Sequence, residues 1–157
     1  MGRFYVGIVA TTLLAGTAAA QQSGPADPAA ELRRGFDEVA AWVSRSADLV
    51  PADKYGYQPA EGVRTFGQLI AHIADSYVWY CAQASGRNVE WSDAIEKAGG
   101  DKAAIVQKLK DATGACNTAY AGSGRLRPLI GNIGHTNLHY GNIITYLRMM
   151  GMVPPSS

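Results

Sequence analysis

The chain has 157 residues, which is enough for one folded domain with a single hydrophobic core. Apolar residues make up 47% of it and charged residues 17%, a globular composition that excludes a wholly disordered chain. The 14 basic residues nearly balance the 13 acidic ones, so no excess positive charge is present to bind a phosphate backbone. We therefore expect no nucleic-acid partner.

The first 20 residues have the pattern of an export signal. Arg3 precedes an apolar run from Phe4 to Leu14, and small residues ending at Ala20 follow it. The run is too short for an ordinary transmembrane helix. We therefore expect a signal peptide over residues 1–20, an exported (periplasmic or secreted) protein, and no stable membrane span once the signal is removed. A retained N-terminal anchor is the alternative.

The first helix is expected to begin after a flexible leader. Residues 21–27 are mostly polar and small, and Asp27 followed by Pro28 is typical of an N-cap and the first residue of a helix. Apolar residues then recur at spacings of three and four, which predicts an amphipathic helix that ends near Pro51. This apolar stripe consists of Leu32, Phe36, Val39, Val43 and Ala47.

A second helix is predicted after a loop rich in proline and tyrosine. Thr65 followed by Gln68 forms a capping-box pattern at its start, and Gly86 is expected at its end. Its apolar stripe consists of Phe66, Leu69, Ile70, Ile73, Tyr77, Cys81 and Ala84. The crossover that follows contains Trp91 and is expected to form a short helical turn over residues 92–98.

Two more helices complete the predicted fold. One begins at Asp101 and is interrupted at residues 121–124, and the other begins near Pro128 and ends near Gly151. Ile105, Leu109, Ala112, Cys116 and Ala119 form the stripe of the first, and Leu129, Ile133, Tyr140, Ile144 and Leu147 that of the second. No segment alternates with the period of a strand. Four amphipathic helices predict an all-α fold, with a four-helix bundle as the simplest way to bury their apolar faces.

The main functional hypothesis concerns the three histidines of the chain. His135 and His139 are four residues apart on the last helix, so their rings lie on one face, one turn apart. His72 lies on the second helix, and all three are at stripe edges, where two helices could bring them together. Three neutral imidazoles suit zinc, nickel, iron or copper and leave a coordination position open. The alternative is three half-exposed histidines at helix seams with no ion.

The remaining polar and aromatic residues give weaker indications. No carboxylate stands at a clear fourth-ligand spacing. Asp75, three residues after His72, could accept the other ring N–H of a histidine or lie in solvent, and we expect it to lie in solvent. Trp42, Trp79 and Trp91 are expected to pack in the fold or at a dimer contact, which leaves a homodimer open. The sequence contains no Ser/His/Asp arrangement and no glycine-rich phosphate loop, so the catalytic residues, if any, stay unknown.

Three segments together resemble the DinB superfamily of small metal-binding helical proteins. They are Thr65–Ala74, which contains His72, the segment from His135 to Asn142 with its two histidines four apart, and Tyr146–Arg148 with the Gly151 that follows. The resemblance implies a DinB-like four-helix bundle over residues 28–157, with up-down-down-up topology. It also implies a divalent transition-metal ion (zinc, nickel or iron) bound by His72, His135 and His139.

The resemblance also suggests a range of functions. Relatives include enzymes that use low-molecular-weight thiols, while many members have no assigned reaction. We therefore expect an exported, metal-dependent enzyme that acts on a small molecule by thiol transfer or hydrolysis. The alternative is a non-catalytic metal- or ligand-binding helical module.

The family topology also bears on the two cysteines. If the second and third long helices run parallel, Cys81 lies 16 residues after the cap Thr65 and Cys116 lies 15 residues after the cap Asp101, at nearly the same level. Because an exported protein meets an oxidising compartment, we expect a disulfide between them. Two buried thiols are the alternative.

Overall fold

The computed structural model describes residues 1–2, 27–122 and 124–157, and the folded part is all-α, as expected. Its helices are α1 (Pro28–Leu49), η1 (Ala52–Lys54), α2 (Phe66–Ala84), α3 (Ala94–Ala98), α4 (Lys102–Ala121) and α5 (Leu126–Met149). The expected signal peptide and nearly all of the leader lie outside the described residues. Within the described ranges, no helix is both long and apolar enough to span a membrane.

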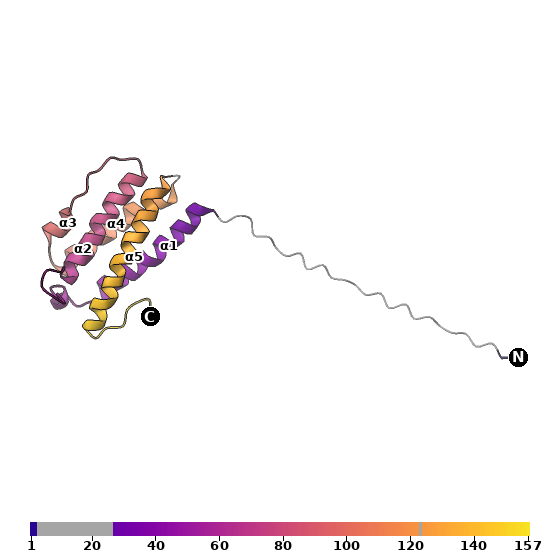
Figure 1. Ribbon diagram of the computed structural model, residues 1–157, viewed down its shortest axis with the longest axis horizontal. Helices are drawn as coiled ribbons and strands as arrows, with labels where there is room; N and C mark the ends of the chain where they lie inside the picture. The colour runs from indigo at the N-terminus through magenta and orange to yellow at the C-terminus, as the bar shows by residue number, and fades with distance from the viewer. Residues whose placement is uncertain (3–26, 123) are drawn as a thin grey trace.

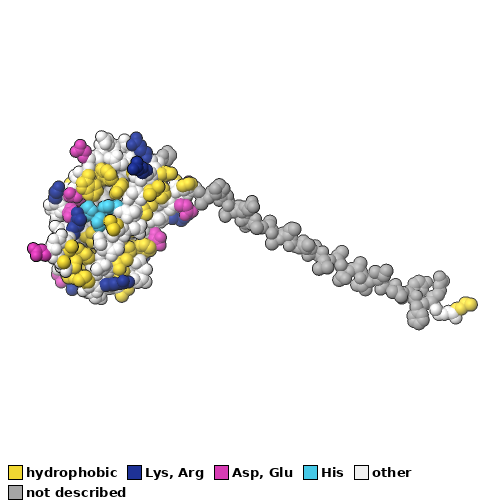
Figure 2. Space-filling view, in the orientation of Figure 1, with side chains coloured by type: hydrophobic (Ala, Val, Ile, Leu, Met, Phe, Trp, Pro, Cys, Tyr) yellow, Lys and Arg dark blue, Asp and Glu magenta, His cyan; other side chains and the backbone are white. Residues whose placement is uncertain are grey.

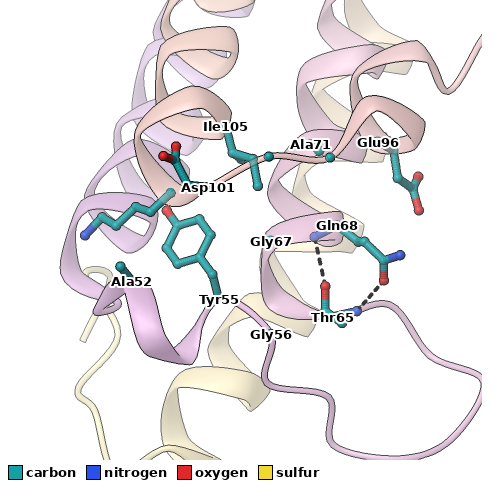
Figure 3. A pocket seen from close by; sticks show the side chains of 13 residues that line it. Ala52, Tyr55, Gly56, Thr65, Gly67, Gln68, Ala71, Glu96, Asp101 and Ile105 are labelled. Atoms are coloured by element: carbon teal, nitrogen blue, oxygen red, sulfur yellow. Dashed lines mark hydrogen bonds between the residues drawn. The ribbon is translucent and has the colours of Figure 1, made fainter.

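Side-chain caps define the starts of three of the four long helices. Asp27 accepts a hydrogen bond from the N–H of Ala29 at the start of α1, and Asp101 accepts one from Ala104 at the start of α4. At the start of α2, Thr65 and Gln68 form the predicted capping box, drawn as dashed lines in Figure 3. Each such cap stabilises its helix by about 1 kcal/mol.

The last long helix begins slightly earlier than its sequence suggests. It starts at Leu126 rather than near Pro128, and Arg125 occupies the N-cap position without a side-chain hydrogen bond. A proline is tolerated in the first turn because the N–H groups there have no partner within the helix. Pro128 therefore lies inside the first turn of α5 instead of marking its start.

Helices α2 and α4 run parallel. Near their starts, Gly67 lies so close to α4 that an added Cβ would be 3.2 Å from Cδ1 of Ile105. Near their ends, Cys81 and Cys116 form the expected disulfide, with their Cα atoms 5.2 Å apart. Contacts at corresponding levels of the two helices require the same direction.

Helices α1 and α5 also share a direction. Gly35 faces Ile133, and seven residues further along each helix Trp42 stacks on Tyr140 with ring centroids 5.3 Å apart. Helix α5 also packs against α2 along most of its length (Figure 1). These pairings are consistent with the expected up-down-down-up order.

One hydrophobic core joins the four long helices. Its largest fully buried side chains are Phe36, Phe66, Ile70, Ile73, Tyr77, Leu109, Ile143 and Leu147. Phe36 of α1 stacks on Tyr120 of α4 at 4.3 Å and meets Tyr77 of α2 edge-on at 5.3 Å. The core therefore fixes α2 against its neighbours, and the α2–α5 seam is the part that positions the histidines.

Candidate metal centre

The three predicted histidines meet at the seam between α2 and α5. The ring centroid of His72 lies 5.2 Å from that of His135 and 4.7 Å from that of His139, and the latter two are 4.4 Å apart. Each residue offers one ring nitrogen, and the three nitrogens lie within 4.8 Å of one another. Figure 2 shows the three rings together on one face of the folded part. The structure thus brings all three residues to one point, as the hypothesis requires.

Burial differs among the three rings but restricts solvent at each. His72 is 7% exposed, and His135 and His139 are partly buried. The Nδ1 atoms of His72 and His135 have no hydrogen-bond partner among the described residues and no contact with solvent. Nδ1 of His139 lies 3.4 Å from the side-chain nitrogen of Asn142, one turn further along α5.

The environment keeps the imidazoles neutral. Burial lowers the pKa of His135 to about 4, and the proximity of His72 and Arg64 lowers it in the same direction. Burial also lowers the pKa of His139 to about 4, with contributions from His135, His72 and Arg64. The pKa of His72 is lowered as well, chiefly by burial and then by Arg64, against the opposing effect of nearby carboxylates. Neutral rings keep the lone pairs that a metal ion requires.

The short helix α3 brings two carboxylates to the far side of His72. Oε2 of Glu96 lies 3.2 Å from Nδ1 of His72, and Oδ1 of Asp93 lies 3.9 Å from the same nitrogen. Arg64, in the loop before α2, donates from Nε to Oε1 of Glu96 at 2.8 Å. These three residues were not predicted from the sequence. The sequence does contain one indication of a paired role, because Asp93 and Glu96 are three residues apart in the predicted turn and so share a face.

Asp75 does not lie in solvent, and that expectation was wrong. It is 4% exposed, and its two carboxylate oxygens accept hydrogen bonds from the backbone N–H groups of Ile95 and Glu96, at 3.0 and 2.9 Å. The first N–H groups of a helix have no partner within it, so a buried carboxylate is stable at this position. Asp75 thereby attaches α3 to α2.

Aromatic side chains border the histidines. Trp91 meets His72 edge-on, with ring centroids 5.5 Å apart. The centroid of the Trp91 ring lies 6.4 Å from that of His135 and 5.9 Å from that of Trp79. Tyr80 lies 5.9 Å from His135 on the α2 side. Trp91, which was expected to pack in the fold or at a dimer contact, is 41% exposed and lies beside the histidine cluster. These rings restrict the directions from which solvent or a ligand can approach.

A cavity opens beside His139. It has a volume of about 600 Å³, and Arg64, Glu96, Asn142 and Tyr146 also contribute to its lining. The Tyr146 hydroxyl donates to the backbone carbonyl of Arg64 at 2.6 Å, which fixes the loop at the cavity wall. The volume is within the range of small-molecule sites.

A second cavity lies behind Glu96. Figure 3 shows it between Tyr55, the start of α2 and the start of α4, with a volume of about 330 Å³. Its lining includes Gly67, Ala71 and Ile105, but no histidine. Of these two cavities, the one beside His139 is adjacent to the candidate metal ligands.

The fold and the site together define an all-α protein in which three neutral histidines offer ring nitrogens close enough together to coordinate a single metal ion. A family model described as the DinB superfamily matches residues 31–153, which include all three histidines. The chain belongs to the DinB superfamily. No curated protein and no solved structure matches it.

Proposed function

We propose that the chain binds one divalent transition-metal ion through His72, His135 and His139. The observation that carries this proposal is the convergence of three neutral imidazoles from two helices at one seam. Imidazole suits zinc, nickel and iron, and three protein ligands leave a position open, as in catalytic rather than structural zinc sites. Membership of the DinB superfamily supports the same assignment.

We further propose that the protein is a metal-dependent enzyme acting on a small molecule by thiol transfer or hydrolysis. Bound at such a site, the ion supplies a Lewis acid that lowers the pKa of a water or thiol. The cavity of about 600 Å³ beside His139 offers room for a small-molecule substrate. The aromatic rings around Trp91 limit the access of bulk water.

A non-catalytic metal-binding module is the second candidate, and one observation favours it. Glu96 contributes a carboxylate to the cavity lining. Its Oε1 accepts a hydrogen bond from Arg64, and its buried Oε2 faces Nδ1 of His72 at 3.2 Å. A carboxylate held by these contacts is badly placed to act as a general base toward a substrate in the cavity. Turnover of thiol-transfer or hydrolytic substrates that disappears with the metal would support the enzyme, whereas metal binding without any turnover would support the module.

We also propose that the protein is exported. The apolar N-terminal pattern supports export, as does the Cys81–Cys116 disulfide, because disulfides persist in oxidising compartments. Expression of the full-length chain in a bacterial host and N-terminal sequencing of the product test this proposal. We expect a mature chain that begins at Gln21, and an uncleaved chain retained in the cytoplasm would contradict it.

Metal analysis tests the metal proposal. Tag-free protein should contain about one transition-metal ion per chain after repletion and removal of excess metal. The His139→Ala variant should lose tight binding, because two imidazoles seldom hold a divalent ion as three do. Leu138→Ala, a change of an exposed neighbour on the same helix, is the matched control and should bind normally. Undiminished affinity in His139→Ala would show that the ligands are assigned wrongly.

A further inference from the structure

The short helix α3 places a buried carboxylate, that of Glu96, beside the proposed metal ligands. It lies beside α2 (Figure 1) and carries Glu96, whose side chain is only 14% exposed. A carboxylate is costly to bury unless hydrogen bonds or charges compensate it. The contacts of Glu96 therefore indicate what holds it in this place.

Two separate contacts fix the position of Glu96. Asp75 accepts hydrogen bonds from the backbone N–H groups of Ile95 and Glu96, at 3.0 and 2.9 Å, and so holds the first turn of α3 on α2. Arg64 donates to Oε1 of Glu96 at 2.8 Å and so sets the rotation of the carboxylate. Together they leave Oε2 pointing toward α2.

The atom that faces Oε2 is Nδ1 of His72. The two atoms are 3.2 Å apart, close enough for a hydrogen bond although not aligned for one. Both are sealed from solvent, and neither has another hydrogen-bond partner among the described residues. A buried polar atom without a partner costs roughly 1–3 kcal/mol. Each atom can remove that cost for the other when the ring carries its proton on Nδ1.

We propose that Glu96 is a positioning residue for His72: it accepts the Nδ1–H of the ring and thereby directs Nε2 toward His135 and His139. This inference rests on the proposed metal site. A metal-binding histidine commonly donates its other ring N–H to a carboxylate, which fixes the tautomer and orientation and makes the ligand nitrogen more basic. Asp75 and Arg64 act one step further out, by holding Glu96.

A competing assignment uses the same residues. His72, Asp93 and Glu96 each offer an atom within 4.8 Å of the other two, so this group could hold an ion of its own. In that case Glu96 would be a ligand rather than a positioning residue. The number of ions bound per chain separates the two assignments.

The test compares four full-length proteins: wild type, Glu96→Ala, Glu96→Gln and the control Glu90→Ala. Glu90 is an exposed glutamate of the same crossover. Zinc affinity and stoichiometry are measured by competition with a chromogenic chelator. The tautomer of His72 is read in the metal-free proteins by two-dimensional nitrogen–proton NMR of the imidazole rings, a signal that a merely structural role of Glu96 would not change.

We expect Glu96→Ala to bind zinc about 10–100-fold more weakly than wild type. Glu90→Ala should be unchanged, and Glu96→Gln should recover part of the affinity because its side-chain carbonyl can still accept the Nδ1–H. The His72 ring should carry its proton on Nδ1 in wild type and Glu96→Gln, and shift toward Nε2–H in Glu96→Ala.

Several results would overturn the inference. Equal zinc affinity and an unchanged tautomer in Glu96→Ala would do so, and so would two zinc ions per wild-type chain with one lost in that variant. If Glu96→Ala does not fold, the wild type alone still tests the inference: a His72 ring that carries its proton on Nε2 would overturn it. A wild-type chain that binds no zinc would overturn the proposed function instead, while the tautomer would still decide the role of Glu96.

Discussion

At the scale of single residues, burial controls the chemistry of the histidine cluster. A histidine in water has a pKa near 6.5, so a part of the rings is protonated at neutral pH. In this chain burial and the neighbouring rings lower the pKa of His135 and His139 to about 4. The rings are therefore neutral over the range in which a metal ion would have to compete with protons.

This pKa shift predicts how the stability of the metal-free chain depends on pH. Between pH 6.5 and about 4 the unfolded chain binds more protons than the folded one, because its histidines keep their ordinary pKa. The free energy of unfolding should therefore fall as pH decreases through this window, and the histidines should contribute no such change above it. Thermal unfolding after metal removal, measured from pH 8 to 4, checks this expectation.

A variant isolates the contribution of the two rings. The double change His135→Asn and His139→Asn removes the titrating groups, so its melting temperature should decrease less steeply between pH 6.5 and 4.5 than that of the wild type. Equal slopes in the two proteins would show that the pKa values of these rings are not lowered in the folded chain.

At the scale of helices, α3 is the shortest α-helix among the described residues, and it is held on α2 by the side chain of Asp75. It has five residues, too few to be stable alone, and Asp75 accepts hydrogen bonds from two of its N–H groups. The stability of α3 therefore depends on its tertiary contacts with α2 rather than on the helix propensity of its own sequence.

Replacing Asp75 tests this dependence. Asp75→Asn keeps the shape but removes the charge and one of the two acceptor oxygens, so we expect a loss of about 1–3 kcal/mol in the local stability of α3. Hydrogen exchange at the amides of Ile95 and Glu96 should become faster. Asp53→Asn, a change at an exposed aspartate, is the control and should have no effect. Unchanged protection at these amides in Asp75→Asn would mean that other contacts hold α3.

The difference between local and tertiary determinants explains how much of the structure could be predicted from the sequence. Helices α1, α2 and α4 were predicted well because local caps such as Asp27 and Thr65, with their apolar stripes, define them. The histidines were found because spacing and family resemblance both indicate them. Arg64 and Glu96 were missed because they come from a loop and a crossover, whose positions depend on contacts far apart in sequence, 32 residues in the case of this ion pair.

At the scale of the whole molecule, the disulfide and the core determine how firmly the histidines are held. Cys81 and Cys116 are both buried and join α2 to α4 across 35 residues of sequence. Asn132 of α5 lies beside them, with its side-chain nitrogen 3.8 and 3.9 Å from the two sulfur atoms. Three of the four long helices therefore meet at this end of the core.

Removing the disulfide should destabilise the fold without removing the metal ligands. The double change Cys81→Ala and Cys116→Ala should lower the free energy of unfolding by about 3–4 kcal/mol, because the unfolded chain regains the freedom of a loop of this size. The melting temperature should fall by roughly 10 °C, and reduction of the wild type should have a similar effect. An unchanged melting temperature in both experiments would mean that the cysteines are not bonded.

The central claim is that one ion binds where α2 and α5 bring His72, His135 and His139 together. The most direct measurement is anomalous X-ray diffraction from crystals of the tag-free protein loaded with zinc, collected at the zinc absorption edge. We predict one strong peak per chain, about 2.0–2.1 Å from a ring nitrogen of each of the three histidines. The absence of a peak at this seam, or a peak bound by other residues, would contradict the claim.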